Sequence, residues 1–202
     1  IMSKVIQLPK KQKFENPCWS FKSDQVNLYS YWNDAFTKKE CEKIIRIAKN
    51  KGLIKGVTMG KSNARKSKVS WLYYSDDMEW VYRRVTDIIL NLNERFFKFN
   101  IFGLNEGFQF TNYKAPSDKY GKHVDRANNF VIRKLSVSIQ LTDPKKYEGG
   151  ELYLYDSDKG HLMDNKQGTL IMFPSYVLHE VTPVIKGERN SLVTWVTGDQ
   201  FK

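Results

Sequence analysis

The sequence predicts an α+β fold that is mainly β, with a barrel-like or jelly-roll sheet. Two amphipathic helical segments lie in the first half of the chain, between residues 35 and 97. After residue 108 the helical periodicity gives way to short apolar or alternating runs separated by Gly, Pro, Asp and Asn. Helices followed by many short strands are typical of α+β domains with a closed or rolled sheet.

The 202 residues are enough for one domain with a core. Residues 1–28 lack sustained periodicity and are expected to form an N-terminal arm. Residues 29–202 are expected to form one domain, with helical support at 35–97 and a β core at 105–200. The chain shows no apolar run of about eighteen residues, no signal-peptide pattern and only two cysteines. We therefore expect a cytoplasmic protein (in the host cytoplasm if phage-encoded) without membrane contact.

The first helix has a clear beginning and end. Thr37 and Glu40 form a capping box, in which each side chain accepts a hydrogen bond from the other residue's backbone N–H. Cys41, Ile44 and Ala48 then recur at helical spacing and predict a buried face. Gly52 is a plausible helix stop.

The second helix is expected from about Asp76 to Phe96. Ser75 or Asp76 can cap it, and Val81, Val85, Ile88, Ile89 and Leu92 form an apolar stripe. The basic, Gly- and Ser-containing residues 55–70, between the two helices, are expected to form a loop with one short strand.

Six strands are expected in the second half of the chain. Residues 136–141 (SVSIQL) alternate strictly between polar and apolar side chains, which suits a strand lining a wet cavity. The expected strands are Phe108–Tyr113, Leu135–Leu141, Glu151–Leu154, Thr169–Phe173, His179–Val184 and Ser191–Thr197.

The net charge of +11 is unevenly distributed. Residues 1–68 hold 16 Lys and Arg against 5 Asp and Glu, whereas residues 69–202 hold 17 of each sign. A basic surface at residues 38–68 can attract nucleic acid or another polyanion. The alternative is a solvated, solubilising face, because no nucleic-acid-binding motif accompanies the lysines.

Two of the three histidines belong to a pattern typical of metal sites. His123 and Asp125 lie two residues apart, so their side chains point to the same side of an extended segment. His179 lies on another expected strand. Two imidazoles and one carboxylate form the facial triad of non-haem iron(II) oxygenases, which leaves coordination positions open. His123, Asp125 and His179 are therefore the candidate catalytic metal ligands.

Arg189 follows His179 by ten residues. Pro183, Lys186 and Gly187 indicate a turn between them, so Arg189 is expected at the start of the strand next to the one that begins at His179. A guanidinium there can bind a carboxylate through two hydrogen bonds. A dicarboxylate that chelates iron at one end would offer its far carboxylate to Arg189.

The order and spacing of these residues resemble the prolyl 4-hydroxylase superfamily of Fe(II)/2-oxoglutarate-dependent dioxygenases, and its short bacterial and phage members most closely. The resemblance covers most of residues 31–197. It rests on an HxD motif and a distal His with a basic residue ten positions later. Further matches are Tyr113, Tyr120, residues 149–152 (GGEL), Trp195 and the helix at 35–48.

The resemblance implies a double-stranded β-helix (jelly-roll) with N-terminal helices buttressing one sheet. It implies Fe(II) as cofactor and 2-oxoglutarate as cosubstrate, with ascorbate as a further candidate cofactor. Arg189 would bind 2-oxoglutarate with help from Tyr113, and Gln140 and Trp195 are further candidate cofactor-binding residues. The implied reaction hydroxylates an unactivated C–H, with a prolyl residue of a protein or peptide favoured, and releases succinate and CO2.

Two other functions stay open at this point. One is an oxygenase acting on nucleic-acid bases, which the basic N-terminal third makes plausible. The other is a non-catalytic module that binds a polyanion on the same fold. The complete triad with Arg189 argues against the second.

Overall fold

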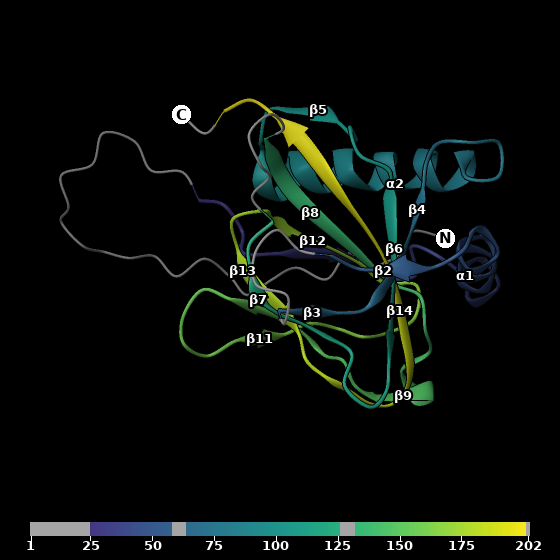
Figure 1. Cartoon of the computed structure of the whole chain (residues 1–202). Helices are drawn as coiled ribbons and strands as arrows, with labels where there is room; N and C mark the ends of the chain where they lie inside the picture. The colour runs from purple at the N-terminus through teal and green to yellow at the C-terminus, as the bar shows by residue number, and fades with distance from the viewer. Residues whose placement is uncertain (1–24, 58–63, 126–131, 201–202) are drawn as a thin grey trace.

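The structure is a computed structural model and describes residues 25–57, 64–125 and 132–200. Two antiparallel sheets face each other, and two helices cover the outer face of the larger sheet (Figure 1). The fold predicted from the sequence, mainly β with N-terminal helices against one sheet, is confirmed. The predicted N-terminal arm lies outside the described residues up to residue 24. Within the described part of the chain, no helix is long and apolar enough to span a membrane.

Helix α1, Lys38–Lys51, forms as its capping signals predict. Thr37 is its N-cap, and the reciprocal hydrogen bonds between Thr37 and Glu40 form a capping box. At the other end the Gly52 N–H donates to the Lys49 carbonyl, with Gly52 at a φ of 100°. Cys41, Ile44 and Ala48 are fully buried, as their spacing predicts.

Helix α2, Glu79–Leu92, starts later than predicted and continues as a five-residue π-helix, Asn93–Phe97. The predicted cap at Ser75 or Asp76 is wrong, because residues 75–78 form a turn and the N-cap is Met78, without a side-chain cap. The predicted apolar stripe of α2 is buried against the larger sheet, together with core residues of that sheet that include Phe108, Phe110 and Leu192.

The larger sheet has nine strands in the order β1-β12-β8-β14-β6-β4-β2, with β5 and β9 also paired to β14. The long strand β14 lies at its centre and pairs with both β6 and β8. Its strands are β1 Ser30–Trp32, β2 Ile54–Lys55, β4 Lys68–Leu72, β5 Ile101–Gly103, β6 Phe108–Lys114, β8 Arg133–Gln140, β9 Tyr147–Gly149, β12 Leu170–Pro174 and β14 Val184–Gly198.

The smaller sheet has five strands in the order β11-β10-β13-β7-β3. In Figure 1 its strands lie on the side of the larger sheet opposite to α2. A second apolar cluster, which includes Tyr113, Leu154 and Phe173, fills part of the space between the sheets. The strands are β3 Arg65–Lys66, β7 Lys119–His123, β10 Leu152–Tyr155, β11 His161–Leu162 and β13 Leu178–Val181.

Two sequence predictions need correction here. Residues 55–70 were expected to be a loop with one strand, but their described part contains pieces of β2, β3 and β4, which belong to both sheets. The strand of Arg189 was expected next to that of His179. Instead, residues 182–183 carry the chain from β13 in the smaller sheet to β14 in the larger one, so the two residues lie on opposite sheets.

Candidate metal and cosubstrate site

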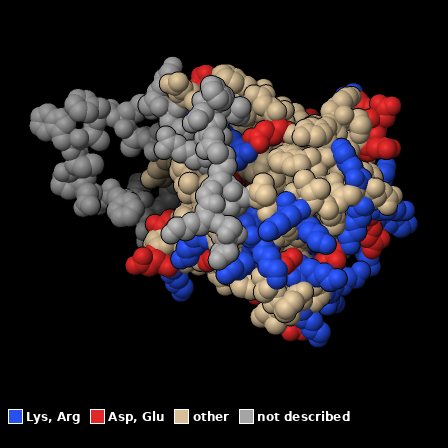
Figure 2. All heavy atoms as spheres, viewed as in Figure 1, with Lys and Arg blue, Asp and Glu red and all other residues tan. Residues whose placement is uncertain are grey.

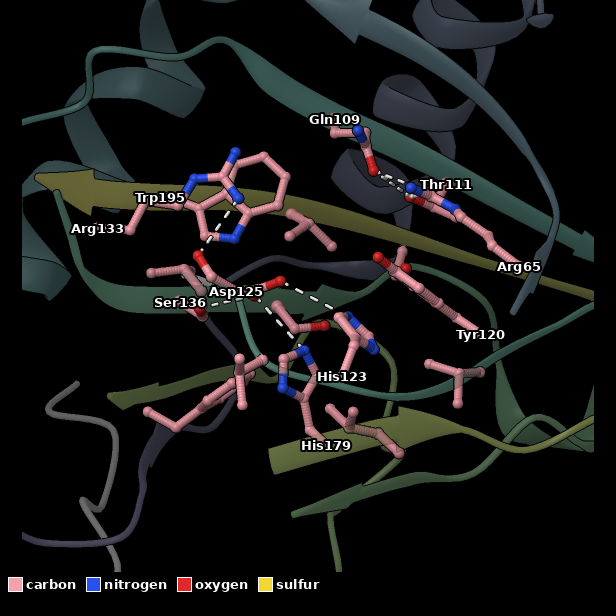
Figure 3. Close-up of a pocket in the computed structure, with 18 of the residues that line it drawn as sticks. Arg65, Gln109, Thr111, Tyr120, His123, Asp125, Arg133, Ser136, His179 and Trp195 are labelled. Carbon is pink, nitrogen blue, oxygen red and sulfur yellow. Dashed lines mark hydrogen bonds and ion pairs between the residues drawn. The ribbon is translucent and has the colours of Figure 1, made fainter. Parts of the chain in front are cut away.

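A cavity of about 700 Å³ opens between the two sheets and falls within the range of ligand-binding pockets. His123, Asp125, His179 and Arg189 all line it, and so does Tyr113 (Figure 3 shows the region around the first three). Five residues that the sequence pattern singled out from separate segments therefore meet at one cavity.

The ligand atoms of the predicted triad converge. Nε2 of His123 lies 3.6 Å from one carboxylate oxygen of Asp125, and Nε2 of His179 lies 3.4 Å from the other. One potential ligand atom from each residue lies within 4.8 Å of those of the other two. The two histidines are directly opposite each other in the β7–β13 pair, and Asp125 follows β7 by two residues.

Both imidazoles are oriented for metal binding by the backbone. Nδ1 of His123 lies 2.8 Å from the Gly121 carbonyl oxygen, and Nδ1 of His179 lies 2.9 Å from the Val177 carbonyl oxygen. Because a carbonyl oxygen only accepts, each Nδ1 carries the proton and each Nε2 has a free lone pair. Burial, reinforced by neighbouring His179, lowers the pKa of His123 to about 4, which keeps this imidazole in the neutral, metal-binding form.

The Asp125 carboxylate is held as an anion. Burial alone would raise its pKa, but the neighbouring imidazoles of His179 and His123, the nearby Trp195 side chain and the hydrogen bond from Ser136 lower it below the ordinary value. The Ser136 hydroxyl lies 2.7 Å from Asp125 Oδ2. Since an ionised carboxylate can only accept, Ser136 is the donor in this contact.

Arg189 presents a buried guanidinium with no acidic partner. Its side chain is 2% exposed, and no carboxylate in the described residues lies within ion-pair distance. One guanidinium nitrogen donates to the Gln140 side-chain oxygen at 2.8 Å, and the ring of Tyr113 lies 5.5 Å from the guanidinium carbon. A buried charge is costly unless a counter-ion is near. The site therefore fits a bound carboxylate.

The other two predicted cofactor-binding residues, Gln140 and Trp195, lie at different ends of the site. Gln140 is fully buried behind Arg189 and does not line the cavity, so it orients the guanidinium through its side-chain oxygen. Trp195 does line the cavity, but it lies beside Asp125 and Arg133, whose guanidinium carbon is 3.7 Å from the indole (Figure 3).

Sequence reasoning missed two arginines of the cavity wall. Arg65 was counted with the basic surface at 38–68, yet it is buried, donates to the Gln109 side-chain oxygen at 2.8 Å and lies 4.8 Å from the Tyr120 ring. Arg133 forms a two-bond ion pair with Glu106 at 2.5 and 2.6 Å. No local signal distinguished Arg65 from the neighbouring lysines, because its burial depends on strands that are distant in sequence.

Comparison with known families agrees with this geometry. Residues 108–197, which contain the triad and Arg189, match the model of the 2OG-Fe(II) oxygenase superfamily. This part of the chain is similar to that superfamily. The 2OG-Fe(II) oxygenases use Fe(II) and 2-oxoglutarate, and the cluster of His123, Asp125 and His179 fits iron.

The curated relatives resemble only part of this chain. A PKHD-type hydroxylase of Nitrosomonas europaea is 36% identical over 87 residues, which are 40% of this chain and 38% of the relative. The PKHD-type hydroxylase YbiX of Escherichia coli is 37% identical over 86 residues, with the same two shares. The matches thus span about two fifths of the relatives' length.

Solved structures share the fold over most of the chain. A Pseudomonas putida prolyl-4-hydroxylase has a TM-score of 0.68 at 20% identity and covers 86% of this chain and 94% of its own. A Trichoplax adhaerens prolyl hydroxylase in complex with a hypoxia-inducible-factor peptide fragment has a TM-score of 0.72 at 20% identity, with coverages of 85% and 84%. A viral collagen prolyl hydroxylase of Paramecium bursaria Chlorella virus-1 has a TM-score of 0.67 at 21% identity, with coverages of 86% and 97%.

Proposed function

We propose that the protein is an Fe(II)/2-oxoglutarate-dependent dioxygenase that hydroxylates a prolyl residue of a protein or peptide. The observation that carries the proposal is the joint placement of a two-histidine, one-carboxylate cluster and an unpaired buried guanidinium on one cavity. When bound, Fe(II) and 2-oxoglutarate would supply, together with dioxygen, the oxidising chemistry that inserts one oxygen atom into a C–H bond, while the second oxygen atom enters succinate and CO2 is released.

The chain contributes binding, orientation and exclusion of water. His123, Asp125 and His179 would hold the metal on one face and leave the opposite side open to the cavity. Arg189 would bind the far carboxylate of 2-oxoglutarate, while Gln140 keeps the guanidinium in position. The protein thereby fixes geometry, and the difficult chemistry belongs to the cofactor.

Support for a prolyl substrate comes from the relatives and from the cavity wall. Similar proteins are named PKHD-type hydroxylases and prolyl hydroxylases, and one solved neighbour contains a peptide. Trp195 and Tyr120 supply aromatic surface near the metal ligands. Aromatic faces suit the apolar ring of proline, which carries no side-chain hydrogen-bonding group.

The two alternative functions make different demands. A non-catalytic module would not need an intact triad and an oriented Arg189. A nucleic-acid-directed oxygenase would use the basic surface, and Figure 2 shows Lys and Arg side chains gathered on one part of the drawn face. Surface lysines such as Lys49 and Lys186 already pair with acidic side chains, Lys49 with Glu188 and Lys186 with Glu148. The predicted polyanion contact at residues 38–68 stays a prediction, and residues 58–63 of this segment lie outside the described residues. Ascorbate binding, a phage or bacterial origin and a cytoplasmic location also stay predictions.

Mass spectrometry tests the proposed function. The iron-loaded protein is incubated with 2-oxoglutarate and either proline-containing peptides or methylated oligonucleotides. We expect the peptides to gain one oxygen and succinate to form in equal amount. Demethylated oligonucleotides with unmodified peptides would contradict the prolyl substrate but keep the cofactor assignment. No succinate with any substrate would contradict the enzyme itself.

A further inference from the structure

A row of three aromatic rings leads from the metal cavity to the protein surface. Trp195 lines the cavity and is 6% exposed. The Trp71 ring, which also lines the cavity, lies 6.2 Å from it, and the Tyr73 ring lies a further 6.4 Å from Trp71. Tyr73 is 60% exposed. The row therefore begins beside the metal ligands and ends in solvent.

The sheet explains why these rings meet. Trp71 and Tyr73 are two residues apart, Trp71 in β4 and Tyr73 directly after it, so their side chains point to the same face. Their rings are stacked, with an interplanar angle of 16°. Trp71 is paired with Gln109 of β6, and Gln109 is in turn paired with Val193 of β14.

Gly107 makes room for the row. Gly107 lies directly before β6, whose first residue, Phe108, is paired with Leu72, the residue before Tyr73. A Cβ at Gly107 would lie 2.8 Å from Cδ1 of the Tyr73 ring, so the ring occupies the space that a side chain would take. The ring contacts thus depend on a position without a side chain.

An exposed tyrosine stacked on a tryptophan has no role in the apolar core. Tyr73 belongs to neither buried cluster, and its aromatic partner is Trp71. The adjacent Tyr74 differs, because its ring packs edge-on against Tyr82 of α2 at 5.7 Å. Tyr74 therefore supports the helix, while Tyr73 extends the cavity wall.

We infer that Trp71 and Tyr73 form an aromatic platform that binds the residues flanking the reacting prolyl in a proline-rich peptide substrate. The inference rests on the proposed peptide substrate. A peptide is the expected ligand of the platform because the platform continues the cavity wall. A peptide whose reacting residue lies beside Trp195 must leave the cavity over this wall, where Trp71 and Tyr73 lie. Proline-rich segments in the extended polyproline II form dock on aromatic-lined grooves at low entropic cost.

The length of the platform sets the number of residues it binds. Ring-to-ring steps of 6.2 and 6.4 Å correspond to roughly four residues of a polyproline II chain, which rises about 3.1 Å per residue. Lys51 marks the outer end, because its ammonium lies 5.3 Å from the Tyr73 ring centroid. The platform thus selects for prolines within about four positions of the reacting residue, on one side of it.

Binding of a proline oligomer of about eight residues to the 202-residue chain, measured by isothermal titration calorimetry, tests the platform. Tyr73→Ala should raise the dissociation constant roughly three- to tenfold, the range expected for one lost ring stack. Tyr73→Phe should bind like the wild type, because it keeps the ring. Gly107→Ala should weaken binding in the same direction by displacing the Tyr73 ring. The matched control is Tyr74→Ala, which should leave binding unchanged.

A second readout ties the platform to substrate choice. For peptides with one reacting proline, replacing flanking prolines by alanine should raise KM for the wild type and raise it by less with Tyr73→Ala, which keeps only the Trp71 ring, while kcat stays the same. Equal binding by wild type and Tyr73→Ala, or an equal loss with Tyr74→Ala, would overturn the platform. Failure of the proposed enzyme function would be recognised separately by the absence of succinate, and the calorimetric comparison would keep its meaning.

Discussion

Replacing Ser136 by alanine should weaken iron binding without removing any metal ligand. The Ser136 hydroxyl donates to Asp125 at 2.7 Å and lies 3.2 Å from the Ser175 hydroxyl, which can donate to it in turn. Both serines are buried, with exposures of 0% and 1%. The substitution therefore removes a dry hydrogen bond that fixes the Asp125 carboxylate toward the two imidazoles.

The expected loss of affinity follows from the charge on the acceptor. A hydrogen bond to a charged group contributes about 1.5–3 kcal/mol, which is a factor of about 10 to 150 in an equilibrium constant. Residues that orient metal ligands commonly contribute about 10- to 100-fold to metal affinity. We expect Ser136→Ala to lower Fe(II) affinity by about 10- to 100-fold, with succinate formation recovered at high Fe(II).

Anaerobic Fe(II) titration by calorimetry measures this affinity, and thermal unfolding checks the fold. Ser138→Ala is the matched control, since Ser138 lies two residues along β8, lines the same cavity and makes no hydrogen bond to Asp125. An unchanged Fe(II) affinity in Ser136→Ala would refute the positioning role. An equal loss in both variants would show that the cavity wall in general, and not the hydrogen bond, supports the metal.

Three further predictions concern the metal, the cosubstrate and the charged surface. His179→Ala should abolish succinate formation, whereas His161→Ala should have little effect, because His161 is an exposed residue of β11 that pairs with Asp156 and does not line the cavity. Arg189→Gln should raise the KM for 2-oxoglutarate about 10- to 100-fold with Fe(II) affinity unchanged, and Tyr113→Phe should raise it by less, because one neutral hydroxyl contributes less than a guanidinium. Lys66→Glu should reduce the salt dependence of weak nucleic-acid binding, measured by fluorescence anisotropy, by a slope of about 1.

Each of these has an outcome that would contradict it. Equal losses at His161 and His179 would mean that the metal ligands are wrongly assigned. Collapse of iron binding in Arg189→Gln would place Arg189 at the metal instead of the cosubstrate. A salt slope that is unchanged by Lys66→Glu would remove this residue from any polyanion contact.

Local signals were sufficient for α1 and for the metal ligands. The capping box of Thr37 and Glu40 and the stop at Gly52 act within a few residues, and the structure places all three as predicted. The strand of His179 was expected because a short apolar run between turn residues is also a local pattern, whereas β7, the strand that ends at His123, was not among the expected strands. The triad could be predicted because its residue types and spacing restrict the chemistry strongly.

Features that depend on the path of the chain between sheets could not be predicted. The two residues between β13 and β14 look like a hairpin turn, but they lead from one sheet to the other. Turn residues occur in both kinds of connection, so the local sequence does not distinguish a hairpin from a crossing between sheets. Arg65 lies in a basic segment, and only its pairing with β7 and its bond to Gln109 bring it into the cavity. The predicted cap of α2 was wrong because residues 75–78 have the polar side chains that are typical of a helix start but form a turn before the helix.

Because His123 and His179 are directly paired, a metal bound to both would also stabilise the smaller sheet. A metal bound to both would link β7 and β13 across the ladder, at the end of the strand where Asp125 follows. A slip of β7 by one residue would turn His123 and Tyr120 to the opposite face and separate the ligands. A metal bound to both histidines would therefore fit only this alignment of the two strands. A bound metal would thus stabilise the pairing of β7 with β13. This matters because the other neighbour of β7, strand β3, is only two residues long.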